Sequence, residues 1–396
     1  MRIVLTKIVS LLAAGLLASI LGLAPAIAAS HLSLRIAGPE EVVLPAGVAC
    51  QAFRDAGGTL DLPDQPMRAI RNRAGEIRVF ASAYANLPFK SANLSTIQHD
   101  GCRPMMQSPL DPDPARYAGR NWIVAPYPMP NGTIYALVHE EYWGGTVDPL
   151  CKQRLNGSAP WSGPCVYLNI VAARSIDGGK SFLPLAGDAQ IVAARPERFT
   201  STMNRAGYRD PSNIVFNPRD KYYYFILFAD RGGPQELGSC ILRTRAPGIE
   251  PWLAWDGQGF NARLAGPYRG GTPRTCMPIT ILSLKALLWD PKSGQIVGSG
   301  MDMRAGGFFY MTSTDLVHWS PSTLLQKAVA SNHWVPGGPP PIAYPSMLDP
   351  TSSSPAFDTI GDHPYIYYVK FQTTLMGKIA GRQRDIVRVP LAIQRN

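Results

Sequence analysis

Four acidic side chains stand where β-strands are expected to begin or end, and they are the first candidates for chemistry. Asp64 lies in LPDQPMRAI and Asp210 in YRDP, each at the start of a strand-like run. Glu140 and Glu141 follow His139 at the end of another such run. A carboxylic acid and a carboxylate that face one cavity can act as general acid and as base or nucleophile, the pair that cleaves glycosidic bonds. The sequence therefore predicts acid–base chemistry if these side chains converge.

Each acid also has a purely structural explanation. Asp64 could tie a turn, and Arg209 could form an ion pair with Asp210 at the strand entrance. Because neighbours along a strand point to opposite faces, Glu140 and Glu141 cannot both face one cavity. We therefore expect one of these two glutamates to be solvated.

Aromatic and polar side chains near the same strand ends are candidate ligand contacts. Flat rings can stack on sugar faces, and Trp143 lies beside two glycines in a predicted loop. Aromatic residues in strands more often belong to the core, so both roles stay open at each position. The candidate substrate-binding residues are Arg68, Asn121, Trp122, His139, Tyr142, Trp143, Arg209 and Ser346.

The elements that must position these residues are predominantly β-strands. Alternating and β-rich runs recur along the chain, and no segment after residue 29 has a sustained helical period. The runs fall into five units, which begin near residues 64, 121, 209, 276 and 344. Sheets repeated around an axis hide their edges, so we predict an all-β, five-bladed β-propeller with long loops on one face. A β-sandwich with long insertions is the alternative.

Two short segments favour hairpin turns at the ends of strands. SIDGGKSF at 175–182 places Asp177 where its carboxylate can accept backbone N–H bonds, with Gly179 free to adopt a positive φ. STDLVHW at 313–319 repeats the serine and aspartate without the glycine. Asp177 and Asp315 are therefore expected to stabilise turns and to take no part in chemistry.

Several segments resemble known propeller families. SIDGGKSF looks like the Asp-box of sialidase-type propellers, and Arg-Asp-Pro at 209–211 resembles a step of the five-bladed glycoside hydrolases that cleave furanosides and xylosides. WIVAPY, YALVHEEYWGG, YPSMLDP and PYIYYVKF look like segments of exported, largely uncharacterised bacterial proteins in that five-bladed superfamily. The resemblance covers nearly the whole chain after residue 29 and implies a carbohydrate ligand.

The resemblance also implies roles for the acids. Asp64 matches the base or nucleophile of those hydrolases, and Asp210 matches the aspartate that orients substrate and tunes the acid. Glu140, Glu141 or Glu236 would supply the proton. The chain departs from the hydrolase pattern because Arg-Asp-Pro lies in the third unit and no glutamate begins an inner strand in the fourth or fifth.

Two hypotheses of function follow from this pattern. The first is a glycoside hydrolase that uses paired carboxylates in an axial pocket, and the second is a non-catalytic, lectin-like propeller that binds glycans. A sialidase would need an arginine cluster, for which Arg68, Arg209 and Arg384 are available. Their spacing is not diagnostic, so a sialidase is less favoured.

The first 29 residues have the layout of a secretory signal peptide. Arg2 and Lys7 precede an apolar run at 11–23, and Ala-Ile-Ala follows at 26–28. We expect cleavage to leave one domain, residues 30–396, which is exported to the periplasm or the extracellular space. No membrane attachment is expected after cleavage.

The six cysteines all follow this leader, and an even number in an exported chain favours disulfides over metal sites. Cys151 and Cys165 flank a short loop and are the safest pair. Pairing Cys50 with Cys102 and Cys240 with Cys276 is only the simplest of the remaining arrangements.

The charge of the chain is basic but dispersed. The formal net charge of +10 falls to +8 once Arg2 and Lys7 are removed, and the remaining lysines and arginines are scattered singly. Nucleic-acid binding is therefore not expected. No phosphate-binding loop or Cys/His metal spacing is present, so we predict no cofactor beyond an optional axial Ca²⁺, and a monomer.

Overall fold

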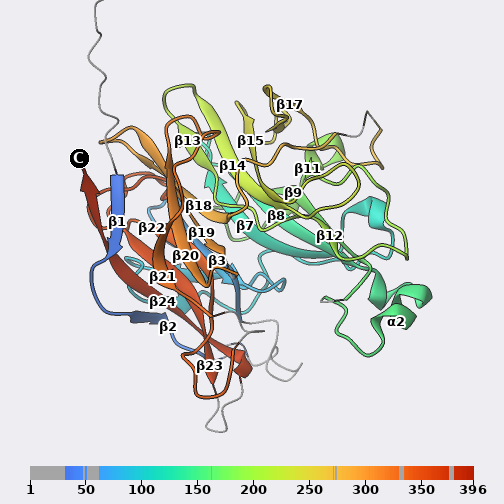
Figure 1. Cartoon of the computed structure of the whole chain (residues 1–396), viewed down its shortest axis with the longest axis horizontal. Coiled ribbons are helices and arrows are strands. Elements are labelled where there is room, and N and C mark those ends of the chain that lie inside the picture. The colour runs from blue at the N-terminus through green and yellow to red at the C-terminus, as the bar shows by residue number, and fades with distance from the viewer. Residues whose placement is uncertain are drawn as a thin grey trace, which may run out of the picture.

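The computed structural model describes residues 32–47, 50, 62–161, 163–270, 272, 274–302, 304–329, 334–373 and 379–396, the last segment with side chains from 383 onward. The predicted signal peptide lies outside the described residues. Within them the chain is mostly β-strand, arranged in four hydrogen-bonded sheets (Figure 1). The all-β prediction is therefore confirmed.

Two of the sheets are four-stranded antiparallel meanders, in which each strand pairs with the next along the chain. The first contains β3 (Pro63–Arg71), β4 (Ile77–Ser82), β5 (Phe89–Ser91) and β6 (Ile97–His99). The second contains β18 (Ser283–Asp290), β19 (Gln295–Asp302), β20 (Gly307–Ser313) and β21 (Thr323–Lys327).

A third, 11-stranded sheet consists of two antiparallel groups. The first group is β7 (Arg120–Pro128), β8 (Ile134–Trp143) and β9 (Val166–Ser175), with β10 (Leu183–Pro184) and β11 (Ile191–Ala193) paired to β9. The second group is β12 (Ala206–Arg209), β13 (Val215–Asn217), β14 (Tyr222–Ala229), β15 (Gly238–Thr244), β16 (Leu253–Trp255) and β17 (Phe260–Ala262).

Among the described strands the two groups pair where β12 runs parallel to β9 at Ala206 and Gly207, and an isolated bridge between Ala194 and Ala265 adds a second link. Gly207 adopts a φ of +154°, and a Cβ there would lie 2.1 Å from the carbonyl oxygen of Leu168. Only glycine allows this approach of two backbones, so residue 207 fixes the junction.

The fourth sheet brings the two ends of the described chain together. It contains β22 (Ile342–Leu348), β23 (Tyr365–Thr373) and β24 (Ile379–Arg395), and β24 also pairs with β1 (Leu32–Ile36) and β2 (Glu41–Leu44). Figure 1 shows β1, in blue, beside the red C-terminal strand.

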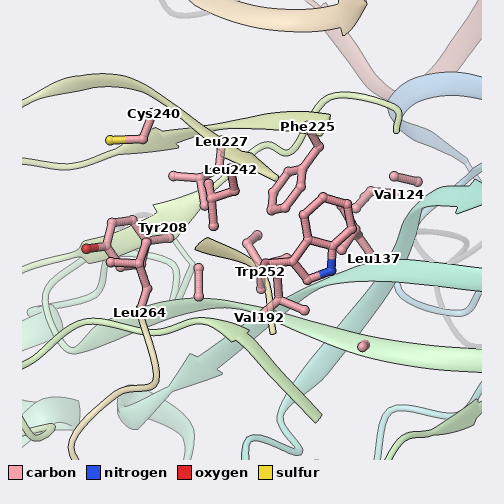
Figure 2. Close-up of a cluster of buried hydrophobic side chains, with 14 of the residues drawn as sticks. Val124, Leu137, Val192, Tyr208, Phe225, Leu227, Cys240, Leu242, Trp252 and Leu264 are labelled. Atoms are coloured by element: carbon pink, nitrogen blue, oxygen red, sulfur yellow. The ribbon is translucent and has the colours of Figure 1, made fainter. Parts of the chain in front are cut away.

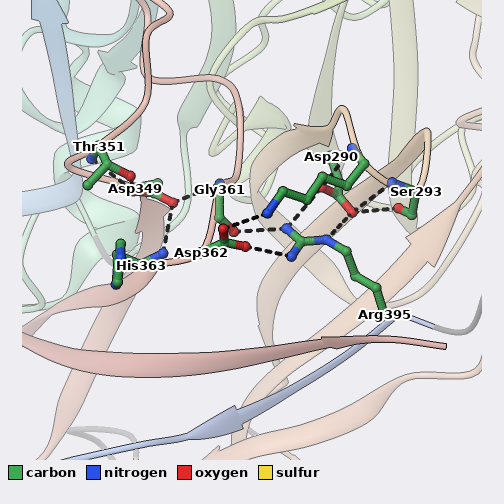
Figure 3. A network of polar contacts seen from close by, with 9 residues as sticks. Asp290, Ser293, Asp349, Thr351, Gly361, Asp362, His363 and Arg395 are labelled. Carbon is green, nitrogen blue, oxygen red and sulfur yellow. Dashed lines mark hydrogen bonds and ion pairs between the residues drawn. The ribbon is translucent and has the colours of Figure 1, made fainter.

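The end of β24 is also fixed to the second four-stranded sheet. Arg395 donates from Nε and Nη2 to the two carboxylate oxygens of Asp290, at 2.9 and 3.0 Å, and from Nη1 to Asp362 at 2.9 Å (Figure 3). Asp290 has no solvent exposure, so this bidentate pair compensates a fully buried charge.

The sheets pack against one another in a closed circuit. β3 contacts β7, β14 contacts β18, β18 contacts β22, and β22 contacts β3. The largest core cluster lies between the two groups of the 11-stranded sheet. Figure 2 shows Phe225 and Leu227 of β14 facing Leu137 of β8, and Trp252 packs edge-on against Phe225 with ring centres 4.8 Å apart.

Helical structure is confined to short connections. The single described α-helix, α2 (Pro149–Leu155), begins at Asp148, whose side chain accepts the N–H of Cys151 at 3.0 Å, and it lies at the periphery in Figure 1. The described 3₁₀ segments are η1 (Pro114–Arg116), η2 (Gly144–Thr146) and η3 (Gly187–Gln190).

The predicted disulfides and turns are present. Cys50–Cys102, Cys151–Cys165 and Cys240–Cys276 are all bonded, which indicates an oxidising environment. Asp177 accepts the N–H groups of Lys180 and Ser181, both at 3.0 Å, and Asp315 accepts those of Val317 and His318 at 2.9 and 2.8 Å. Both aspartates therefore stabilise turns, as expected.

Candidate functional site

A cavity of about 120 Å³ lies where several strands and loops meet, and it collects most of the predicted acids. Asp64, Asp210 and Glu141 all line it, and they come from parts of the chain far apart in sequence. The other lining residues are Gln65, Pro66, Trp122, Val124, His139, Arg205, Pro211 and Tyr344. The cavity lining therefore combines three carboxylates with an indole ring, an imidazole ring and the guanidinium group of Arg205.

Strand pairing determines which side chains of β7 and β8 reach the cavity. Trp122 lies opposite His139, and Asn121 lies opposite Glu140. Because side chains alternate, Trp122, His139 and Glu141 share the cavity face, whereas Asn121 and Glu140 share the other face.

Asp210 is held by two cations. Its backbone has a φ of +54°, an uncommon conformation for aspartate, and its carboxylate accepts from Lys285 Nζ at 2.7 Å and from Arg209. Burial would raise the pKa of Asp210, but the charges of Lys285 and Arg209 outweigh it and hold that pKa far below its usual range. Asp210 is therefore ionised at any physiological pH. Arg209 also pairs with Asp230 at 3.0 Å. The ion pair between Arg209 and Asp210 that the sequence suggested is therefore present, and Asp210 still faces the cavity.

Asp64 is bound by partners from the last sheet. Arg384 Nη1 donates to Asp64 Oδ1 at 2.6 Å, and the Tyr344 hydroxyl donates to the same oxygen at 3.1 Å. The side chain of Asp64 is 26% exposed to solvent, so it can contact a ligand. The charge of Asp64 and burial together raise the pKa of Tyr344, which keeps that hydroxyl a hydrogen-bond donor.

Glu141 is the buried acid of the cavity. It accepts from the indole N–H of Trp143 at 2.6 Å and from Arg205 Nη2 at 3.3 Å, and His139 Nε2 lies 3.7 Å from its Oε1. Burial raises the pKa of Glu141 despite the opposing charge of Arg205. A carboxyl group that holds its proton at higher pH than usual is suited to general acid catalysis.

His139 adds a neutral polar group to the same wall. Its ring lies 5.8 Å from that of Trp122, and burial lowers its pKa to about 3 although the charge of Asp210 opposes this. His139 therefore contributes an uncharged imidazole near neutral pH.

Glu140, the other predicted acid, is buried on the opposite face of β8. Its carboxylate accepts from the Gly119 N–H and from Asn169 Nδ2, both at 2.8 Å. Burial raises its pKa to about 7. The expectation that one of the two glutamates is solvated is wrong, because β8 is covered on both faces and both side chains are buried.

Arg68 connects strands and does not line the cavity. It donates from Nε to the Val124 carbonyl at 3.2 Å and from Nη2 to the carbonyls of Pro211 and Lys285. It is buried, and burial lowers its pKa to about 9. Arg68 therefore joins β3, β7, the segment after β12 and β18.

The remaining predicted residues also lie outside the cavity lining. Tyr142 donates to the Pro112 carbonyl at 2.9 Å and packs in the core, and Ser346 is fully buried in β22. Trp143 lies behind the lining, where its indole N–H donates to Glu141. The guanidinium carbon of Arg120 lies 3.6 Å from the centre of the Trp143 ring. Glu236 is exposed in a loop. Asn121 and Arg209 make the contacts described above.

Sequence reasoning missed several members of the site. Arg205 comes from the long connection before β12, where nothing in the local pattern marks it. Tyr344 carried a usable signal, because it enters a strand in the fifth unit and adopts a φ of +57° that turns it toward Asp64. Lys285 lies in the middle of an apolar run, where a single lysine indicates a buried ionic partner.

Two further observations concern metals and membranes. Within the described ranges, no three His, Cys, Asp or Glu side chains gather closely enough to hold a metal ion. The described part of the chain also contains no helix with the length and apolar character needed to cross a membrane. The expected lack of a cofactor stays a prediction.

Comparison with known proteins yields structural likeness only. No protein-family description matches the chain, and no curated protein matches it in sequence. A solved family 117 glycoside hydrolase from the marine bacterium Zobellia galactanivorans is 9% identical, with a TM-score of 0.50, over 92% of this chain and 90% of that chain.

Two other solved structures are less similar. An N-acetylgalactosamine deacetylase from F. plautii, in complex with blood group B trisaccharide, has a TM-score of 0.47 and 12% identity over 91% of this chain and 95% of that chain. A GH43_1 enzyme from Xanthomonas citri has a TM-score of 0.44 and 14% identity over 86% of this chain and 92% of that chain. The chain therefore shares its fold, across nearly all of its length, with a family 117 glycoside hydrolase.

Proposed function

We propose that this chain is an exported glycoside hydrolase with a five-bladed propeller fold, and that its catalytic groups line the cavity around Asp64, Asp210 and Glu141. One observation carries the proposal. Three carboxylates face one cavity beside an indole ring, and the surroundings of two of them differ so that Glu141 is poised to give a proton and Asp210 to stay ionised.

The pairing of the strands supports the proposed division into five blades. The 11-stranded sheet would comprise two blades, since the described strands of its groups share the short parallel contact at Ala206 and Gly207 and otherwise meet at the isolated bridge between Ala194 and Ala265. The circuit of contacts from β3 back to β22 then encloses an axis on which Arg68 binds carbonyls of neighbouring blades. In this arrangement the turns at Asp177 and Asp315 are Asp-boxes, residues 30–396 form one domain, and residues 1–29 are a signal peptide.

In the proposed reaction each carboxylate has a separate role. Glu141 protonates the departing glycosidic oxygen, because its raised pKa keeps a proton available. Asp64 acts as base or nucleophile, since its side chain is partly exposed and its carboxylate is oriented by hydrogen bonds from Arg384 and Tyr344. Asp210 stays ionised and orients the substrate.

The cavity also favours a terminal sugar as the group bound. At about 120 Å³ it is smaller than the roughly 300–1,000 Å³ of pockets that enclose drug-sized ligands. Trp122 offers an aromatic face for stacking, and the neutral imidazole of His139 can bind a hydroxyl without adding charge. We therefore propose hydrolysis at chain ends.

The test is hydrolysis of aryl arabinofuranosides, xylosides and galactosides by the mature protein. Turnover should fall at least 100-fold in Glu141→Gln and Asp64→Asn, the size typical for loss of an acid or base. Glu140→Gln is the matched control, because residue 140 is an adjacent glutamate on the opposite face of the same strand. Equal losses in E140Q and E141Q would contradict the assignment.

The alternative is a glycan-binding protein without turnover, and one observation favours it. Each of the three carboxylates is already paired with a cation, namely Arg384, Arg205 or the Lys285–Arg209 pair. Tight binding of a glycan without hydrolysis, in a protein whose E141Q variant binds equally well, would support this reading.

A further inference from the structure

A groove much larger than the cavity lies at the other end of the strands. Its volume is about 950 Å³. Most of its lining comes from three turns, at residues 71–76, 127–134 and 176–180. Phe216, Tyr223 and Pro355 complete the lining. Asp64 stands near the start of the nine-residue strand β3 and Arg71 ends it, so the cavity and the groove lie toward opposite ends of that strand. The groove is therefore independent of the proposed catalytic site.

Three cations of the groove have no carboxylate partner within the described part of the chain. Arg71 donates to the Ser352 carbonyl at 3.4 Å, and Arg73 donates to the Pro130 carbonyl at 2.7 Å. Lys180 is exposed and makes no ion pair among the described residues. Their positive charges are thus available to a ligand.

The two acids of the groove offset this charge only in part, since three cations against two carboxylates leave the lining with a net charge of +1. Asp177 accepts from the Ser175 and Ser181 hydroxyls at 2.7 and 2.6 Å and also ties its turn. Glu76 accepts from Asn72 at 2.8 Å and lies 3.5 Å from Arg78, which is outside the groove lining. The lining therefore presents a positive field to an approaching molecule.

Aromatic rings line the same groove as these cations. Tyr223 packs against Tyr127 with ring centres 5.3 Å apart and against Phe216 at 5.0 Å, and Tyr223 and Phe216 are only partly buried. Ile176 stands at the rim with 82% of its surface exposed. Apolar rings and an exposed branched side chain can contact the C–H faces of sugars, whereas arginine and lysine bind their acidic substituents.

We propose that this groove is a second carbohydrate site, which binds a segment of an acidic polysaccharide whose carboxylates contact Arg73 and Lys180 and whose rings stack on Tyr223. The site needs no reaction at the cavity. It would hold a polymer at one end of the molecule while a chain terminus reaches the other end.

The proposal is tested by binding of polygalacturonate to the purified protein, followed by calorimetry at low and at high salt. The double variant Arg73→Gln/Lys180→Gln should bind roughly fivefold or more weakly, as expected from two exposed ionic contacts, and the affinity of the wild type should fall with salt. Tyr223→Leu keeps an apolar side chain but removes the flat ring, and it should also weaken binding. The melting temperature of each variant shows whether it is folded. If Y223L is not folded, the binding affinity of the Arg73→Gln/Lys180→Gln variant alone tests the proposal.

Matched controls separate the groove from general charge and from catalysis. Arg103→Gln/Lys152→Gln removes the same charge from exposed positions outside the groove and should bind like the wild type. Glu141→Gln should also bind normally, so that a failure of the catalytic proposal leaves this one standing.

Dextran tests the need for acidic groups, and polyglutamate tests the need for sugar rings. Binding of dextran and of polyglutamate that is weaker than binding of polygalacturonate would support the proposal. Absence of polygalacturonate binding, equal binding by the groove and control double variants, or equal affinity for polyglutamate would overturn it.

Discussion

The buried carboxyl group of Glu140 should make the stability of this protein depend on pH in a way that one substitution removes. The residue keeps only 1% of its surface exposed, and burial raises its pKa from 4.5 to about 7. Glu140→Gln keeps an acceptor for the Gly119 N–H. Asn169 can rotate its amide to present Oδ1, which has no partner among the described residues, to the new NH₂ group. The variant should therefore fold.

The sign follows from proton binding. Because the pKa of Glu140 is higher in the folded state, that state binds more protons between pH 4.5 and about 7. The contribution of Glu140 to stability is thus fully present below pH 4.5 and is lost as the pH rises through about 7. At about 1.4 kcal/mol for each pKa unit, the loss amounts to about 3 kcal/mol.

The assay is urea unfolding of wild type and E140Q at several values between pH 4.5 and 8.5. The free energy of unfolding of E140Q, relative to wild type, should increase by about 3 kcal/mol across this range and level off above the folded pKa. Glu236→Gln, at an exposed glutamate, controls for the loss of one carboxylate. A difference that stays flat, or that decreases with pH, would refute the assignment of Glu140 as a buried acid with a raised pKa.

Three further outcomes are expected. Arg205→Gln removes a charge that lowers the pKa of Glu141, so the pH above which kcat/KM falls should be higher in the variant than in the wild type. If that pH is unchanged, Glu141 is not the acid. Arg395→Gln leaves Asp290 buried without its bidentate partner and should cost roughly 3 kcal/mol in chemical unfolding, whereas Arg35→Gln, an exposed position in β1, should cost little. Gly207→Ala places a Cβ 2.1 Å from the Leu168 carbonyl and should lower the melting temperature by several degrees more than Gly270→Ala, which shares the strain of a positive φ but whose Cβ would meet no atom within 4 Å. If G207A melts like G270A, the close contact of β9 and β12 is not needed for stability.

Local patterns were sufficient for the strands and for part of the site. Alternation along β8 correctly separated Glu140 from Glu141, and the strand entrances identified Asp64 and Asp210. Alternation alone does not tell whether both faces of a strand are covered, and so the burial of both glutamates was missed. Spacing and compartment predicted the Cys151–Cys165 disulfide, whereas the other two pairs, also present, were only the simplest of the remaining arrangements.

The rest of the site depends on contacts between distant segments. Arg205 reaches Glu141 from a long loop, and Arg384 reaches Asp64 across 320 residues of sequence. Arg68 was expected to bind substrate, yet its guanidinium is used by carbonyl groups of other strands. Such pairings are set by how sheets pack around one another, which no local periodicity encodes.

The pairing of β1 with the end of β24 constrains when the molecule can fold. Residues 32–36 remain without their hydrogen-bonded neighbours until residues 391–395 have been synthesised, so the fourth sheet can assemble only after nearly the whole chain has emerged. The adjacency of these two strands also means that a short linker between them, with new ends opened at an exposed turn such as Asn131–Gly132, should give a circularly permuted protein with the same sheets.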